Sequence, residues 1–406
     1  MTSTHLPAPP SPAQVRGATR ATYAAFIGAG FAFASWAARI PQVRTRLDLD
    51  PAALGLVLLA IAAGSVIALP LSGPVIARLG SRRTVIVMSG LLTVSLVVIA
   101  LGHPAGVVPL MVGLFLMGFA NGAWDVGMNV QGAVVERHLG RAIMSRFHAG
   151  FSLGTVAGAL VGAAMVALEV SVTAHLVGVA VLVGIAVPPA VRGFLPDVDE
   201  ATAPPEGSSG GILAAWREPR TLLIGLFVLA FAFAEGTAND WITVALIDGH
   251  GTSEALGAVG FAIFLIAMTG ARWIGPGLLH RHGRVAVVRL MAGLAVVGLV
   301  LFVFGPNAPV AVLGALLWGA GTSLGFPVGM SAGADDPARA ATRVSVIASI
   351  GYCAFLAGPP LIGFLGHQIT VLRALTVVAV LLAVATAIAG CLREPATSMQ
   401  QSGDAP

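Results

Sequence analysis

The stretch Thr84–Trp124 reads TVIVMSGLLTVSLVVIALGHPAGVVPLMVGLFLMGFANGAW and contains no Asp, Glu, Lys or Arg. A helix needs about 20 mostly apolar residues to cross the hydrocarbon core of a membrane. The stretch is long enough for two such helices, and the segment from His103 to Gly106, with its Pro and Gly, marks the turn between them. We therefore predict two membrane-spanning helices over 84–102 and 107–134.

The rest of the chain has the same character. Further stretches without Asp, Glu, Lys or Arg cover Pro51–Ala77, Leu290–Ala334 and Val344–Leu372. Division at Gly and Pro predicts an all-α membrane protein with twelve transmembrane helices. The predicted spans are 21–40, 51–77, 84–102, 107–134, 144–168, 171–193, 220–247, 254–279, 285–304, 309–333, 343–365 and 370–392.

The composition excludes most other classes of protein. Mean hydropathy is +0.91, and 10% of the residues are charged, against about 25% in soluble domains. The net charge of +4 does not predict nucleic-acid binding, because the basic residues form short clusters between apolar runs. Cys353 and Cys391 have no metal-binding or redox spacing, so we expect no disulfide, metal or cofactor.

The basic residues predict the orientation. If both termini are cytoplasmic, the inner segments hold most of the 22 basic residues, as the positive-inside rule requires. We therefore expect a multi-pass protein of the inner membrane that acts as a monomer in the lipid bilayer. The predicted parts are a disordered tail (1–20), a six-helix bundle (21–194), a charged, Pro- and Ser/Gly-rich cytoplasmic linker (195–219), a second six-helix bundle (220–393) and a tail (394–406).

The two predicted bundles share short sequences at one spacing. Leu54-Gly55 and Gly73-Pro74 recur as Leu256-Gly257 and Gly275-Pro276, and Val126-Gly127-Met128 recurs as Val328-Gly329-Met330. Agreement in one register, on corresponding helices, predicts two pseudo-symmetric halves. Small residues at Gly28, Gly30 and along Gly154–Gly162 are interpreted as sites of close helix contact rather than as a dinucleotide fingerprint, because no strand precedes them.

The connection after the second span reads GPVIARLGSRR from Gly73 to Arg83. It resembles the loop signature of the major facilitator superfamily, Gly-x-x-x-Asp-Arg-x-Gly-Arg-Arg/Lys. The resemblance implies that the loop latches one closed state of a transporter. Ala77 and His280 replace the Asp of the signature, so a weaker latch or other partners are expected, and a simple positive-inside anchor is the alternative. The predicted gating residues are Gly73, Arg78, Gly80, Arg82, Arg281, Gly283 and Arg284.

Two predicted helices carry polar residues one turn apart. Asn121, Asp125 and Asn129 share one face of the fourth span, and the seventh span repeats the pattern with Glu235, Asn239 and Thr243. Charged groups at membrane depth cost several kcal/mol and usually face a cavity or a partner. We therefore predict a cavity between the first, fourth, seventh and tenth helices. Its predicted lining residues are Trp36, Asn121, Asn129, Asn239, Asp240 and Arg272.

The acids of this cavity have two interpretations. A buried carboxyl can take up a proton near neutral pH, so Asp125, with Glu235 as second choice, is predicted to couple transport to protons. Alternatively, one of these acids pairs with Arg272 and only holds helices together. Arg272 lies about 10 Å and Asp125 about 14 Å from the inner ends of their predicted helices, which allows a pair without requiring it.

Longer motifs suggest a branch of the family. The segments Ser35–Pro41, Val130–Arg137, Ala232–Trp241 and Asp248–Gly251, with Trp318–Pro327, resemble the YbjJ-type inner-membrane transporters. Asp125 and Asn129 are more loosely similar to a motif of fucose permeases, and rhizopine-type carriers are also similar. The resemblance implies a non-enzymatic secondary transporter for a sugar, polyol or related polar solute. A drug or metabolite efflux antiporter is the main alternative, and a membrane receptor or enzyme a remote one.

Overall fold

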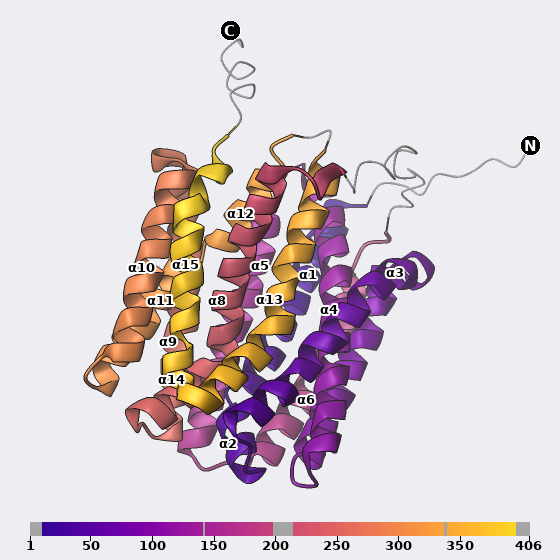
Figure 1. Ribbon diagram of the computed structural model, residues 1–406. Coiled ribbons are helices and arrows are strands. Elements are labelled where there is room, and N and C mark those ends of the chain that lie inside the picture. Colours follow the sequence, from indigo (N-terminus) through magenta and orange to yellow (C-terminus); the bar gives the residue numbers. More distant parts are fainter. Residues whose placement is uncertain (1–9, 141–142, 198–213, 337–338, 395–406) are drawn as a thin grey trace, which may run out of the picture.

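The computed structural model describes residues 10–140, 143–197, 214–336 and 339–394. In this part of the chain all regular elements are helices (Figure 1). Residues 1–9, 198–213 and 395–406, which make up much of the predicted tails and linker, lie outside the described residues. The first half comprises α1 (Pro12–Ala37), α2 (Ile40–Arg46), α3 (Pro51–Gly102), α4 (Val107–Leu139), α5 (Met144–Ala167), α6 (Val172–Ala190) and η1 (Val191–Gly193).

The second half repeats this arrangement after the linker. Its elements are α8 (Pro219–His250), α9 (Glu254–His282), α10 (Arg284–Phe304), α11 (Ala308–Thr322), α12 (Gly325–Gly333), α13 (Ala340–Ile369), α14 (Val371–Ala374), α15 (Thr376–Ile388) and η2 (Ala389–Leu392). The predicted tenth span is thus divided into α11 and α12, and the twelfth into α14, α15 and η2.

Gly80 divides α3 into two membrane-crossing helices. Its backbone has φ 77° and ψ 158°, a conformation that favours glycine, and the helix on either side of it is regular. Gly283, between α9 and α10, has nearly the same angles, φ 76° and ψ 158°. Among the described residues, eleven helical segments are long and apolar enough to span a membrane. Because α3 provides two of the crossings, the prediction of twelve spans is confirmed.

The start of α1 differs from the prediction. The helix begins at Pro12 rather than at residue 21, so part of the expected tail is helical. The Ser11 hydroxyl accepts a hydrogen bond from the Gln14 backbone nitrogen at 3.3 Å, and the Gln14 side chain accepts one from the Ser11 nitrogen at 2.7 Å. This reciprocal capping fixes the helix start, a local signal that the hydropathy pattern does not contain.

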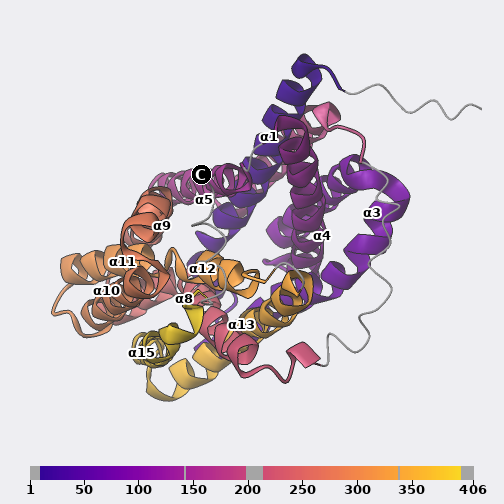
Figure 2. The ribbon, with the colours of Figure 1, turned by 90° about the horizontal axis from the view of Figure 1, so that it is seen from above.

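The two halves meet along two seams. The helix α5 packs against α9, and α13 packs against the first part of α3 (Figure 2). At the second seam the backbones come very close, since a Cβ added at Gly55 would lie 2.5 Å from the carbonyl oxygen of Pro359. We call the end of the molecule that carries α2 the α2 end, and the opposite end, where α1 begins, the Pro12 end.

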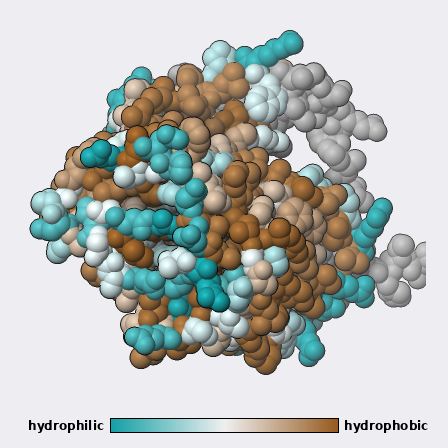
Figure 3. Space-filling model, turned by 60° about the horizontal axis from the view of Figure 1, so that its bottom comes forward, coloured by the Kyte–Doolittle hydropathy of each residue, from teal (hydrophilic) through white to brown (hydrophobic). Residues whose placement is uncertain are grey.

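Glycines also bring α1 and α5 together within the first half. A Cβ at Gly154 would collide with the carbonyl oxygen of Ile27, and one at Gly158 would lie 2.5 Å from that of Phe31. The interpretation of these small residues as helix-contact sites is confirmed. Large apolar side chains such as Ile185, Leu290 and Val380 are exposed on the outside of the bundle. Viewed toward the α2 end, hydrophilic side chains gather on that end, beside extensive hydrophobic surface (Figure 3).

Candidate functional site

Asp125 is the acidic side chain near the middle of α4. The amide nitrogen of Asn129, one turn further on, donates to the Asp125 backbone oxygen at 2.8 Å and to the carboxyl Oδ1 at 3.2 Å. Within the described part of the chain no basic side chain forms an ion pair with it. Tyr352 on α13, in the other half, lies close enough for the Asp125 charge to act on it. Asp125 therefore lies near the boundary between the halves, and no cation in the described part of the chain pairs with it.

Glu235 is the partner of Arg272. The Arg272 Nη2 donates to the Glu235 carboxylate at 2.8 Å, and its Nε donates to the backbone oxygen of Ser323 at 3.1 Å. The pair joins α8 to α9 and to the interruption between α11 and α12. Since 29% of the Arg272 side chain and 24% of the Glu235 side chain remain exposed, the pair is not fully enclosed by protein. Of the two acids, Arg272 therefore binds Glu235, and among the described residues Asp125 has no basic partner.

Three other predicted cavity residues lie on the same helices. Asn121 on α4 and Asn239 and Asp240 on α8 are each partly exposed. Their side chains make no hydrogen bond within the described residues. Their polar groups are therefore free to bind water, protons or a solute.

Two residues at this site were not predicted from the sequence. His148 on α5 is solvent-exposed and lies close enough to Arg272, across the boundary between the halves, for the Arg272 charge to act on it. Tyr352 on α13 likewise lies within range of the charge of Asp125, which is in the other half. A single His or Tyr on an apolar helix has no spacing signal. Only the packing of α5 against α9, and of α13 beside the first half, brings them to the site.

Trp36 lies differently from the other predicted cavity residues. Its side chain is only 2% exposed, in the apolar core, and its indole nitrogen has no hydrogen-bond partner among the described residues. Trp124, Trp241 and Trp318 are enclosed in the same way, and their indole N–H groups likewise lack a partner in the described part of the chain. In this conformation Trp36 offers no ring surface to the space that borders Asp125 and Glu235.

Contacts between the halves close the α2 end. Three polar pairs cross from one half to the other. Arg44 forms an ion pair with Asp248, the Gln42 amide donates to the Glu254 carboxylate at 2.8 Å, and His367 lies 3.4 Å from Asp50. Arg39, next to them, stays within the first half, where it is buried and donates to His175 Nδ1 and to the backbone oxygen of Val170.

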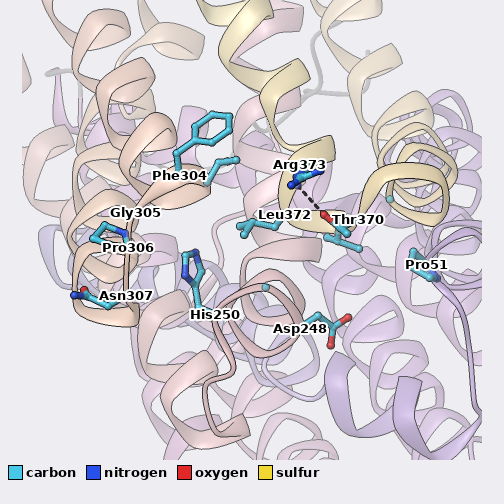
Figure 4. Close-up of a pocket in the computed structure, with 14 residues that line it drawn as sticks. Pro51, Asp248, His250, Phe304, Gly305, Pro306, Asn307, Thr370, Leu372 and Arg373 are labelled. Carbon is cyan, nitrogen blue, oxygen red and sulfur yellow. Dashed lines mark hydrogen bonds between the residues drawn. The ribbon is translucent and has the colours of Figure 1, made fainter.

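A pocket of about 920 Å³ opens beside these pairs (Figure 4). Its wall comes mainly from the second half, at the end of α8, the α10–α11 connection and the α13–α14 connection, with Pro51 from the first half. Asp248 and His250 both line it, and the His250 Nε2 is bonded to the backbone oxygen of Phe302 at 2.7 Å. The pocket lies at the α2 end and is therefore distinct from the site around Asp125.

At the Pro12 end, the first predicted gating loop contacts an acid from another element. Asp197, just after η1, accepts hydrogen bonds from the Ser81 backbone nitrogen and, at 2.5 Å, from the Ser81 hydroxyl. These bonds cap the helix that starts after Gly80. Arg78 and Arg82 are exposed and make no hydrogen bond or ion pair within the described residues. Gly73, within the helix before this turn, is also exposed.

The second predicted loop follows the same plan. Arg284, just after Gly283, bonds Asp335 at 2.6 Å and lies 3.4 Å from Glu394, whereas Arg281 is exposed. Asp197 follows η1, the last element of the first half, and contacts Ser81, where the second part of α3 begins. Glu394 follows η2, the last element of the second half, and contacts Arg284, where α10 begins. Each loop therefore has an acid beside it, although Ala77 and His280 stand at the Asp position of the signature. All of these contacts stay within one half.

Comparison with known proteins identifies the family. The model of the Major Facilitator Superfamily matches residues 21–354. The chain belongs to this superfamily. The Uncharacterized transporter y4wD of Sinorhizobium fredii is 32% identical over 92% of this chain and 98% of that protein. An MFS-type transporter of Yersinia pestis is 32% identical over 89% of this chain and 92% of its own length, and Membrane protein MosC of Rhizobium meliloti is 28% identical over 85% and 83%.

Solved structures share the fold. A mutant of the nucleoside transporter NupG has a TM-score of 0.75 at 15% identity and covers 93% of this chain and 98% of its own. A mutant of the Escherichia coli fucose:proton symporter FucP has a TM-score of 0.59 at 16% identity, over 92% and 98%. The chain is therefore a non-enzymatic, multi-pass membrane transporter for a small solute. Its place in the YbjJ-type branch stays a prediction.

Proposed function

We propose that this transporter moves a small polar solute, a sugar, polyol or related metabolite, by alternating access, and that Asp125 carries a coupling proton. One observation carries the proposal. Asp125 lies at membrane depth on the boundary between the halves, beside amide side chains, and no basic group in the described part of the chain neutralises it. Glu235, the second choice, is weakened as a proton carrier because Arg272 already pairs with it.

The arrangement of the halves supports alternating access. Polar pairs between the halves close the α2 end, whereas the polar contacts described at the Pro12 end stay within each half. This is the arrangement expected of one of the two access states. If the termini are cytoplasmic, as the basic residues predict, the described state opens to the cytoplasm.

The nature of the site supports a polar cargo. The polar side chains of the site are amides, carboxyls, a guanidinium, an imidazole and the phenol of Tyr352, and the amides of Asn121 and Asn239 have no partner among the described residues. A site for a lipophilic drug would instead be lined with apolar and aromatic side chains. NupG and FucP, which share the fold, are named for a nucleoside and for fucose with a proton, and their polar cargoes support the proposal.

The proton has a specific task in this proposal. When the empty cavity closes and loses its water, a bare carboxylate costs several kcal/mol. The deprotonated, empty carrier is therefore blocked, and a proton on Asp125 releases it. Cargo and proton are coupled because the two halves move only when this charge is neutralised.

Asp125→Asn tests the assignment. A thermal-shift screen of the purified chain against sugars, polyols and common antibiotics first identifies a cargo. In vesicles, Asp125→Asn should abolish accumulation driven by a pH gradient, while binding and solute-for-solute exchange persist, because the amide resembles the protonated acid. Asp125→Glu should keep partial coupling. Accumulation by Asp125→Asn with the pH gradient as sole driving force would reject Asp125, and loss of coupling in Glu235→Gln alone would transfer the role to α8.

A further inference from the structure

Three acidic side chains lie at membrane depth on the central helices, and only two of them have partners within the described residues. Glu235 is paired with Arg272 at 2.8 Å, and Asp125 accepts a hydrogen bond from the Asn129 amide. Asp240 on α8 has neither a hydrogen bond nor an ion pair in that part of the chain. An isolated carboxyl at this depth is costly and usually functional. The proposed single proton on Asp125 leaves Asp240 unexplained.

Asp240 and Glu235 project from different faces of α8. Five residues separate them, which corresponds to about 140° around a helix. Gly236, four residues before Asp240, lies on the Asp240 face, and a Cβ there would be 3.2 Å from the ring of Phe355 on α13. Glu235 instead reaches Arg272 on α9. Asp240 is therefore on the α13 side of α8, away from the arginine that neutralises Glu235.

An aromatic pair connects this face with Asp125. Tyr352, which lies within range of the Asp125 charge, and Phe355 are neighbours on α13, with ring centroids 6.2 Å apart. Phe355 in turn meets α8 at Gly236. Asp125 and Asp240, the two acids without an ion pair in the described residues, thus flank the same stretch of α13.

The carboxyl group of Asp240 is not fully enclosed by protein. The residue is partly exposed, and neither carboxyl oxygen is among the fully enclosed polar atoms that lack a partner. Its carboxyl group borders solvent-accessible space and is nevertheless deeply surrounded by protein. In the proposed open state, water in this space gives a proton a route to the carboxyl group, and a dry cavity would leave its charge unscreened.

The helices that pack around α8 provide no ion-pair partner for Asp240 within the described residues. No ionisable residue occurs in α11, α12 or α15. At membrane depth, the ionisable residues of α13 are Tyr352 and Cys353, and the ionisable residue of α9 is Arg272. The ionisable groups of α2 and α14, with His367 on α13 and Glu254 on α9, lie at the α2 end, and those of α1 lie toward the Pro12 end. None of these groups forms an ion pair or a hydrogen bond with Asp240 within the described residues.

We infer that Asp240 is a second proton-binding site, so that the carrier takes up two protons, one on each half, before its empty form changes state. This inference rests on the proposed function and extends it. The argument that applies to Asp125 applies to Asp240 equally, because both carboxylates would be left unneutralised in a closed, dry cavity. Glu235 needs no proton, because Arg272 moves with it in the same half.

Infrared pH-difference spectroscopy tests the inference with the proton itself as the ligand. The full chain is reconstituted in lipid, and spectra are recorded while the pH is lowered from alkaline to mildly acidic. Protonated carboxyl groups give carbonyl-stretch bands that shift in deuterated buffer. Wild type should show two such bands from enclosed carboxyls. Asp240→Asn should lose one, Asp125→Asn the other, and the double variant both, whereas Glu235→Gln should keep both.

The controls separate the possible failures. Glu169→Gln, at an exposed acid in the α5–α6 connection, removes a carboxyl elsewhere and should keep both bands. Asp240→Glu retains a carboxyl and should keep a second band at a shifted frequency, which also serves if Asp240→Asn fails to fold. An Asp240→Asn spectrum identical to wild type, or an Asp240→Glu spectrum without the second band, overturns the second site and leaves Asp125 intact. An unchanged Asp125→Asn spectrum would instead reject the coupling proposal.

Discussion

At the scale of single residues, Arg272 and Glu235 provide a test of how the site is held together. Arg272→Gln leaves the Glu235 carboxylate uncompensated, and we expect it to destabilise the protein by about 1–3 kcal/mol. The expected cost is below the 3–5 kcal/mol of a fully buried pair, because about a quarter of each side chain is exposed. The double variant Arg272→Gln/Glu235→Gln should recover most of the loss. The measurement is apparent thermal stability in detergent, and strictly additive losses would contradict the pairing.

The sequence predicted these residues but not their partners. Asp125, Glu235 and Arg272 could be found because charged residues within long apolar runs are rare and conspicuous. Their pairing depends on helix rotation and on packing between distant segments, and neither follows from hydropathy. His148 and Tyr352 were not predicted for the same reason, because only tertiary contacts place them near Arg272 and Asp125.

At the scale of elements, the contact between α1 and α5 depends on glycine. Gly154→Ala places a methyl group against the Ile27 carbonyl oxygen, so α5 must move away from α1. We expect a loss of about 1–3 kcal/mol in stability, typical of overpacking. Gly178→Ala on α6, where no atom lies within 4 Å, is the matched control and should be neutral or stabilising. Equal thermal stability of the two variants would show that the contact tolerates the methyl group.

Most elements could be predicted because a span is defined by local length and apolarity. The connections around Gly80 and Gly283 also appeared in the sequence, as Gly/Arg loops. The early start of α1 at Pro12 depends on a cap between Ser11 and Gln14, to which hydropathy is insensitive. The interruption at Ser323 and Leu324 was not predicted, although the sequence contains a signal for it. Pro327 has no N–H to donate to the Ser323 carbonyl, which accepts from Arg272 instead.

At the scale of the whole molecule, sidedness can be tested by cysteine labelling. After Cys353 and Cys391 are replaced by Ser, a single cysteine at exposed Glu169 reports on the α2 end, and one at exposed Arg82 reports on the Pro12 end. If the termini are cytoplasmic, a membrane-impermeant maleimide should label Glu169→Cys in intact cells and Arg82→Cys only after permeabilisation. The reverse pattern, read as labelled protein on a gel, would invert the orientation and make the described state open to the outside.

The tryptophans of the chain lie in two environments that fluorescence can distinguish. The protein has six tryptophans, and four of them, Trp36, Trp124, Trp241 and Trp318, lie in the core on α1, α4, α8 and α11, two in each half. Trp216 and Trp273, at 42% and 69% exposure, lie on the surface. Ultraviolet emission therefore comes from two populations, a blue-shifted one shielded from aqueous quenchers and a surface one open to its surroundings. None of the four enclosed indole N–H groups is hydrogen-bonded within the described residues. Water or a solute that reaches one of these rings therefore shifts the emission wavelength of that tryptophan.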